Sequence, residues 1–146
     1  MILLDTDHLT VLRYIDNPRC ATLTARLRLA GDQTLVATTV VSAEEQLRGW
    51  LAEINRYRDI DKQILAYERL VKLFDFFKNW EILPFDWRAA DQFKRLRKAQ
   101  IRVGTLDLKI ASMALVHDAL LLSANLRDFG QVPGLRVENW MEQIPT

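Results

Sequence analysis

Gly104-Thr105-Leu106-Asp107-Leu108-Lys109-Ile110-Ala111 is the stretch on which the predicted fold depends. A loop glycine precedes Thr105, and threonine is a favoured N-cap because its hydroxyl accepts a hydrogen bond from an N–H of the first helical turn. Apolar residues then recur at helical spacing as far as Val116. The pattern predicts a helix with Thr105 as its N-cap and Asp107 in its first turn. A carboxylate there either complements the helix dipole or belongs to a site at the helix entrance. Other acids in the chain favour the site.

Three further acids follow short apolar runs that are typical of buried strands. Asp5 comes after Ile2-Leu3-Leu4, Glu45 after Leu35-Val36-Ala37, and Asp128 after Leu120-Leu121-Leu122. The carboxyl ends of parallel strands lie at one edge of a sheet, where ligands bind, so we expect the acids to share one crevice. Two unit charges ~4 Å apart repel by ~1 kcal/mol even in water, and a bound cation would relieve that repulsion.

The nature of the ligands predicts the kind of cation. Oxygen ligands alone favour Mg²⁺ or Mn²⁺ over zinc. Cys20 is the only cysteine, and His8 and His117 lie in no ligand pattern, so we expect both histidines on a helix surface or partly buried. Such a metal site usually acts on phosphate esters, because the ion neutralises phosphoryl oxygens and lowers the pKa of an attacking water. Hydrolysis of phosphodiesters is therefore the leading chemistry.

The composition is that of an ordinary globular chain. Its 146 residues, 49% of them hydrophobic and 27% charged, predict a single domain spanning 1–146. A net charge of +1 provides no global field for a polyanion, so contact with nucleic acid would depend on local basic patches. One cysteine excludes an internal disulfide framework, and no apolar run approaches the ~20 residues that span a bilayer. We expect a cytoplasmic protein with no targeting segment and no membrane contact.

Strand signals alternate with helix signals along the chain. We expect strands at Ile2–Leu4, Thr34–Thr38, Glu81–Phe85, Leu120–Ala124 and Leu135–Glu138, and helices for about two turns after Asp5, over 19–29, from 42 onward, and over 59–79, 86–100 and 105–116. This alternation predicts an α/β/α sandwich with a central parallel sheet. Ser42 and Glu45 have the spacing of a capping box, which is the structural alternative for Glu45.

Several segments of the chain also carry a family likeness. They are Leu3-Leu4-Asp5-Thr6-Asp7, Ser42-Ala43-Glu44-Glu45-Gln46-Leu47-Arg48-Gly49, Gly104–Ala111, and Leu121–Phe129 followed by Val132–Leu135. Together, in this order and spacing, they resemble PIN-domain ribonucleases, and the nearest subgroup is the VapC toxins of toxin–antitoxin modules. The resemblance implies Mg²⁺- or Mn²⁺-dependent endonucleolytic cleavage of RNA, a homodimer, and neutralisation by a cognate VapB-type antitoxin.

The resemblance also assigns residues. Asp5, Glu45 and Asp107 match the family's metal-binding acids, with Glu45 preferred over Glu44 because it lies four residues before Gly49. Asn125 stands where the family often has a fourth acid, and Asp128 lies one position out of step with another. We therefore expect the metal at Asp5, Glu45, Asp107 and Asn125, catalysis at Asp5, Glu45, Asp107 and Asp128, and substrate contacts from Thr6, Arg48, Lys98, Arg102 and Thr105.

Two helices carry surface patterns. Apolar residues from Ile60 to Phe77 recur at helical spacing, which indicates core or a dimer surface rather than a platform for bases. The 88–98 segment is rich in Arg and Lys, which indicates either a solvated face or a path for RNA phosphates. In the second case Lys98 and Arg102 are the best candidates, and Arg48 is the next.

Two other functions remain open from the residues. Asp5-Thr6-Asp7 after a strand also resembles the haloacid-dehalogenase phosphatases, in which the first aspartate is a nucleophile and the second a general acid. That family needs a later lysine and a late acidic pair, and neither is convincingly placed here. The other alternative is a non-catalytic PIN-like module that binds RNA or a protein, because Asn125 replaces an acid. Retention of Asp5, Glu45 and Asp107 argues against it.

Overall fold

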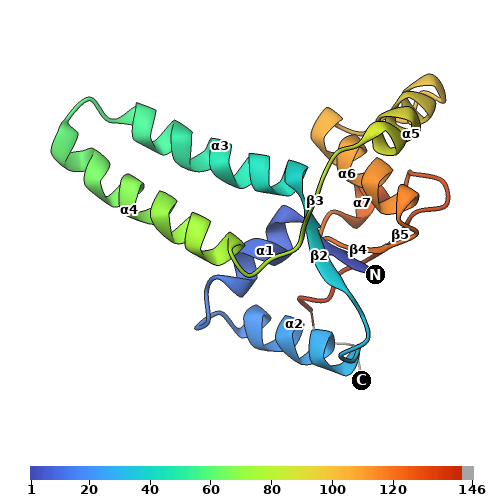
Figure 1. Ribbon diagram of the computed structural model, residues 1–146, viewed down its shortest axis with the longest axis horizontal. Helices are drawn as coiled ribbons and strands as arrows, with labels where there is room; N and C mark the ends of the chain where they lie inside the picture. Colours follow the sequence, from blue (N-terminus) through green and yellow to red (C-terminus); the bar gives the residue numbers. More distant parts are fainter. Residues whose placement is uncertain (143–146) are drawn as a thin grey trace.

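A parallel sheet forms the centre of the molecule (Figure 1). A computed structural model describes residues 1–142, so the last four residues of the expected 1–146 domain lie outside the described part. Within it, five strands pair in parallel in the order β3-β2-β1-β4-β5. They are β1 (Ile2–Leu4), β2 (Val36–Thr39), β3 (Ile82–Leu83), β4 (Leu120–Leu122) and β5 (Arg136–Glu138). The predicted α/β architecture is confirmed.

Helices connect the strands and cover both faces of the sheet. They are α1 (Thr6–Leu12), α2 (Pro18–Leu29), α3 (Val40–Arg56), α4 (Ile60–Phe77), α5 (Trp87–Lys98), α6 (Thr105–Val116) and α7 (Leu126–Phe129). The short α7 is not among the helices expected from the sequence. The third and fourth strands are shorter than predicted, since residues 81, 84, 85, 123 and 124 lie outside them.

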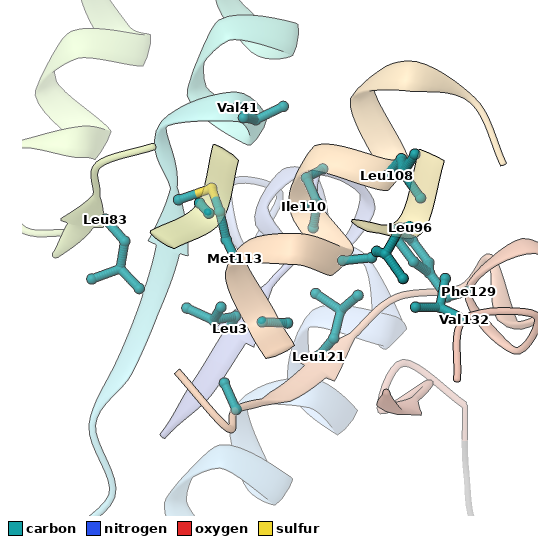
Figure 2. Close-up of a cluster of buried hydrophobic side chains, with 14 of the residues drawn as sticks. Leu3, Val41, Leu83, Leu96, Leu108, Ile110, Met113, Leu121, Phe129 and Val132 are labelled. Atoms are coloured by element: carbon teal, nitrogen blue, oxygen red, sulfur yellow. The ribbon is translucent and has the colours of Figure 1, made fainter. Parts of the chain in front are cut away.

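β1 is buried on both faces, and each face packs into its own core. Leu3 points into the cluster shown in Figure 2, with Leu121 of β4 and Met113 of α6. Ile2 and Leu4 point the other way, toward helices α1 and α2. Because side chains alternate along a strand, the apolar run of β1 supplies both cores at once.

Strand register brings separate parts of the chain to one edge. Leu4 lies opposite Thr38 of β2 and Leu122 of β4. The first residues beyond β1 and β4, Asp5 and Ser123, are therefore neighbours at the carboxyl edge of the sheet.

Two predicted helix caps are wrong. α3 begins at Val40, with Thr39 as N-cap accepting a hydrogen bond from the Ser42 N–H, so Ser42 and Glu45 form no capping box. α6 begins with Gly104 as N-cap and has no side-chain cap, so Thr105 is the first helical residue. In both cases the N-cap lies one or more residues earlier than expected.

α3 and α4 form a hairpin that extends away from the sheet (Figure 1). One face of α4 is exposed along its length, with Ile64, Tyr67, Val71 and Phe74 each at least half exposed. The core interpretation of these apolar residues is wrong, and the dimer-surface interpretation stays a prediction. Among residues 1–142, every helix is too short or too polar to cross a membrane.

Candidate active site

Asp5 is the first residue after β1 and the N-cap of α1. Its Oδ1 accepts a hydrogen bond from the Thr6 N–H at 2.7 Å, and its Oδ2 accepts one from the Ser123 hydroxyl at 2.7 Å. The side chain is buried, with the residue only 6% exposed. Asp5 is thus fixed in place from β4 as well as from its own helix.

Glu45 reaches the same edge from the second turn of α3. Its Oε2 accepts a hydrogen bond from the Thr6 hydroxyl at 3.3 Å. Its Oε1 is buried and has no hydrogen-bond partner in the described structure. A buried carboxylate oxygen without a donor is costly, so this atom is positioned for a partner that the protein alone does not supply.

Asp107 enters from the first turn of α6. This helix follows α5, so Asp107, unlike Asp5, does not come directly after a strand. Asp107 and Glu45 nevertheless line one hollow of about 370 Å³. The Asn125 amide donates to Asp107 Oδ2 at 3.2 Å and to Asp128 Oδ2 at 3.0 Å, while its carbonyl oxygen accepts from the Asp128 N–H.

Burial, with added repulsion from nearby carboxylates, disfavours the ionised forms of the three acids. Burial, with added repulsion from Asp7, raises the pKa of Asp5 to about 6. Burial, with added repulsion from Asp5, raises the pKa of Glu45 to about 7. Burial also raises the pKa of Asp107, and repulsion by Asp128 adds to that rise. Crowded carboxylates of this kind mark functional sites in many proteins.

Asp7 behaves differently from these acids. Although burial acts to raise its pKa, hydrogen bonds from His8 and from the Ala124 N–H lower it below the ordinary value. His8 is fully buried, so the expected surface position is wrong. Its Nδ1 lies 2.6 Å from Asp7 Oδ1, and its Nε2 accepts a hydrogen bond from the Trp140 N–H. Sequence reasoning missed this link between the site and the last described segment.

The predicted substrate-contact residues are not gathered in one place. Thr6 lies among the acids, and Thr105 lines the same hollow as Asp107, with its hydroxyl accepting a hydrogen bond from Arg97. Arg48 forms a salt bridge with Glu44 on the exposed side of α3. Lys98 and Arg102 are exposed.

The residues present suit a hard divalent cation by their chemistry. Several carboxylates converge with raised pKa values, one buried oxygen lacks a partner, and sulfur and imidazole take no part in this cluster. As the side chains stand, no group of three or more His, Cys, Asp or Glu residues within 1–142 is drawn together tightly enough to hold an ion. The acids would have to move inward to share one.

Comparison with known proteins identifies the fold. The model of the PIN domain matches residues 2–135. Ribonuclease VapC2 of Rickettsia felis is 28% identical over 116 residues, which cover 77% of this chain and 78% of that protein. The tRNA(fMet)-specific endonuclease VapC of Salmonella typhimurium is 30% identical over 84 residues, covering 55% of this chain and 64% of that protein.

Solved structures agree on the architecture. The crystal structure of VapBC2 from Rickettsia felis bound to a DNA fragment from their promoter has a TM-score of 0.72 at 22% identity, over 96% of this chain and 99% of that one. The crystal structure of DNA-bound VapBC from Salmonella typhimurium also has a TM-score of 0.72 at 22% identity, over 95% of this chain and 97% of that one. The chain belongs to the PIN domain family, a family of nuclease domains that is in general metal-dependent.

Proposed function

We propose that this chain, as a single PIN domain spanning 1–146, is the endoribonuclease toxin of a VapBC-type toxin–antitoxin pair. One observation carries the proposal: Asp5, Glu45 and Asp107 converge at the carboxyl edge of the sheet, each with a raised pKa. Membership of a nuclease family and the ribonuclease relatives support the choice of RNA as substrate.

Asp5, Glu45 and Asp107 would hold Mg²⁺ or Mn²⁺, with Asn125 or Asp128 completing the site. When bound, the ion would neutralise phosphoryl oxygens and lower the pKa of the attacking water. Asp107 and Asp128 are kept together by the Asn125 amide, which donates to both. In this geometry Asn125 orients the two carboxylates, while its carbonyl oxygen caps α7.

Thr6 and Ser123 fix the directions of the acids. The Thr6 hydroxyl donates to Glu45 while its N–H donates to Asp5, so one residue holds two carboxylates. The Ser123 hydroxyl donates to Asp5 at 2.7 Å and lies 3.3 Å from Asp7 Oδ2. These contacts leave the buried Glu45 Oε1 as an acceptor without a hydrogen-bond partner in the described structure.

The test is cleavage of a labelled single-stranded RNA by the purified chain in Mg²⁺, in Mn²⁺ and in EDTA. We expect internal cleavage with either metal, none in EDTA, and none with Asp107→Asn in any condition. The Asn variant keeps the shape of Asp107 and should melt no lower than the parent, because it removes a repelled charge. Parent-rate cleavage by that variant would overturn the metal assignment.

Two alternatives have their own outcomes in the same assay. Turnover of a small phosphomonoester would favour the phosphatase. In that family the second aspartate, here Asp7, would be the general acid. Asp7 accepts hydrogen bonds from His8 and from the Ala124 N–H and has a lowered pKa, so it is unsuited to donate a proton. Inactivity toward both substrates, with RNA still bound, would favour the non-catalytic module.

A VapB-type antitoxin and a second copy of the chain are the proposed protein partners. The solved VapBC assemblies of the same fold support the first. The exposed apolar face of α4 supports the second. Co-purification with the product of a short reading frame immediately upstream of this gene would test the antitoxin. Failure of that product to block RNA cleavage would contradict it.

A further inference from the structure

A groove leads from the acids to the hairpin of α3 and α4. Next to Glu45 and Thr6 lies a hollow of about 320 Å³ that continues along Gly49 and Trp50 of α3. Beyond it lies a larger hollow of about 560 Å³, walled by α1, α3 and α4. The two hollows share Arg13, Tyr14 and Trp50, so together they form one continuous surface depression, called here the hairpin groove.

The hairpin groove is lined by aromatic side chains and cations. Trp50, Tyr14 and Phe76 supply rings, and Arg13, Arg69 and Lys72 supply positive charge. The Arg69 guanidinium carbon lies 5.5 Å from the centre of the Trp50 ring, and that of Arg13 lies 5.9 Å from the Phe76 ring. Stacking against rings fixes these cations in the wall while leaving N–H groups for a ligand.

The net charge of the lining is positive once internal pairs are counted. Three acids line the groove. Glu45 belongs to the acid cluster at one end of it. The other two are offset by residues outside the groove, since Glu53 pairs with Arg56 at 3.5 Å and Asp75 pairs with Lys78 at 3.0 Å. In residues 1–142, Arg13, Arg69 and Lys72 form no salt bridge. The groove therefore keeps its cations for an anionic ligand.

We propose that the hairpin groove binds single-stranded RNA on one side of the scissile phosphate, with bases stacked on Trp50 and Tyr14 and phosphates on Arg69 and Lys72. Aromatic platforms beside a positively charged track are the physical requirements for a single strand. The proposal rests on the proposed function, since it places the substrate of that same site. Gln46 couples the groove to the acids: its amide donates to the Thr6 carbonyl and Thr10 hydroxyl, and its oxygen accepts from Arg13.

Binding is measured by fluorescence anisotropy of a labelled single-stranded RNA in EDTA, over a range of salt concentrations. Arg69→Gln with Lys72→Gln should reduce the log–log salt slope by ~1.4, because each phosphate contact contributes ~0.7 for a single strand. Trp50→Ala should weaken binding about tenfold with an unchanged slope, and Trp50→Phe should retain most of the affinity, because the ring is kept.

Two control pairs of variants remove the same charge elsewhere. The first pair is Arg19→Gln with Arg28→Gln. Both arginines are exposed on α2, so this double variant should leave RNA binding unchanged. Lys98→Gln with Arg102→Gln tests the rival path along the basic helix α5. If the salt slope of RNA binding falls only in the Lys98 and Arg102 double variant, the proposal for the hairpin groove is wrong and the RNA runs along α5.

Cleavage kinetics separate this proposal from the proposed function. With metal present, Arg69→Gln with Lys72→Gln should raise KM for a longer RNA while matching the parent on a dinucleotide, which is too short to extend from the acids to these two side chains. If the parent cleaves RNA and the double variant behaves as the parent on long substrates, RNA does not bind in the hairpin groove. The proposed nuclease function is unaffected by that result. If the pair binds RNA normally but no longer binds the purified antitoxin, the groove belongs to a protein and the proposal fails. Absence of cleavage by the parent itself would count against the proposed function alone.

Discussion

Asp5 sits where its charged form is disfavoured. Its pKa in the folded chain is about 6, against 3.8 for an unperturbed aspartate, with burial as the main cause. A group whose pKa is raised on folding stabilises the protein while protonated, and this contribution is lost as the pH rises from below 4 through about 6. Without metal, the contribution of Asp5 should therefore make the protein less stable above neutral pH than in mild acid.

Asp5→Asn should remove this pH dependence. At about pH 8 in EDTA we expect the free energy of unfolding of the variant to exceed that of the parent by about 3 kcal/mol, or ~9 °C in Tm, and at about pH 4 by almost nothing. Asparagine is an equally good N-cap for α1, so the helix start is retained. Thermal melts followed by circular dichroism across pH measure the difference.

A matched control comes from Asp32, an exposed acid in the turn before β2. Asp32→Asn should melt like the parent at every pH. A lower Tm for Asp5→Asn at high pH, in the absence of metal, would contradict the assigned repulsion.

Glu45 and Glu44 are neighbours in sequence with opposite environments. Glu45 faces the crevice with a pKa near 7, whereas Glu44 pairs with Arg48 on the outer side of α3. Glu45→Gln should abolish RNA cleavage, and Glu44→Gln should stay within about twofold of the parent, as expected of a surface change. Because Thr39 caps α3, neither variant should alter the helix start, and equal melting curves would verify this. Loss of activity in Glu44→Gln alone would reverse the assignment.

Single residues differ in how far their environment could be predicted from sequence. The positions of Asp5 and Glu45 were predictable because an acid at the end of a buried parallel strand, or soon after it, lies at the carboxyl edge of the sheet. The burial of His8 was not, because it depends on the Trp140 N–H, which comes 132 residues later in the chain. A local pattern carries no information on such a partner.

On the scale of single elements, the exposed face of α4 makes the clearest prediction. Ile64, Tyr67 and Val71 lie one turn apart and leave an apolar stripe uncovered. The proposed dimer should be converted to a folded monomer by Ile64→Glu with Val71→Glu, measured by light scattering at matched concentration. Lys62→Glu, on another side of the same helix, is the control. A dimer that persists in the double variant would place the interface elsewhere.

Helix ends show why elements are predicted better than their boundaries. All strands and the long helices were expected in the right order, since apolar periodicity extends over many residues. The caps of α3 and α6 were misplaced by a few residues, because several Ser, Thr and Gly residues nearby satisfy the same local rule. Tertiary packing decides among them: Thr39 is fully buried beneath α3, which leaves Ser42 inside the helix.

At the scale of the whole molecule, β1 lies in the middle of the sheet although it is the first strand of the chain. Its partner β4 begins at Leu120, and Asp5 receives its Ser123 hydrogen bond from 118 residues away. The central sheet therefore depends on non-local strand pairing, which forms slowly because loop closure must precede it.

This arrangement delays the assembly of the proposed active site during protein synthesis. While ribosomes are still translating the first hundred codons, the nascent chain contains Asp5 and Glu45 but neither α6 nor β4, so the crevice cannot assemble. Truncated products released by stalled ribosomes before Leu120 lack the neighbour strand that holds Asp5 in place. The proposed nuclease activity would therefore become available only once most of the message has been read.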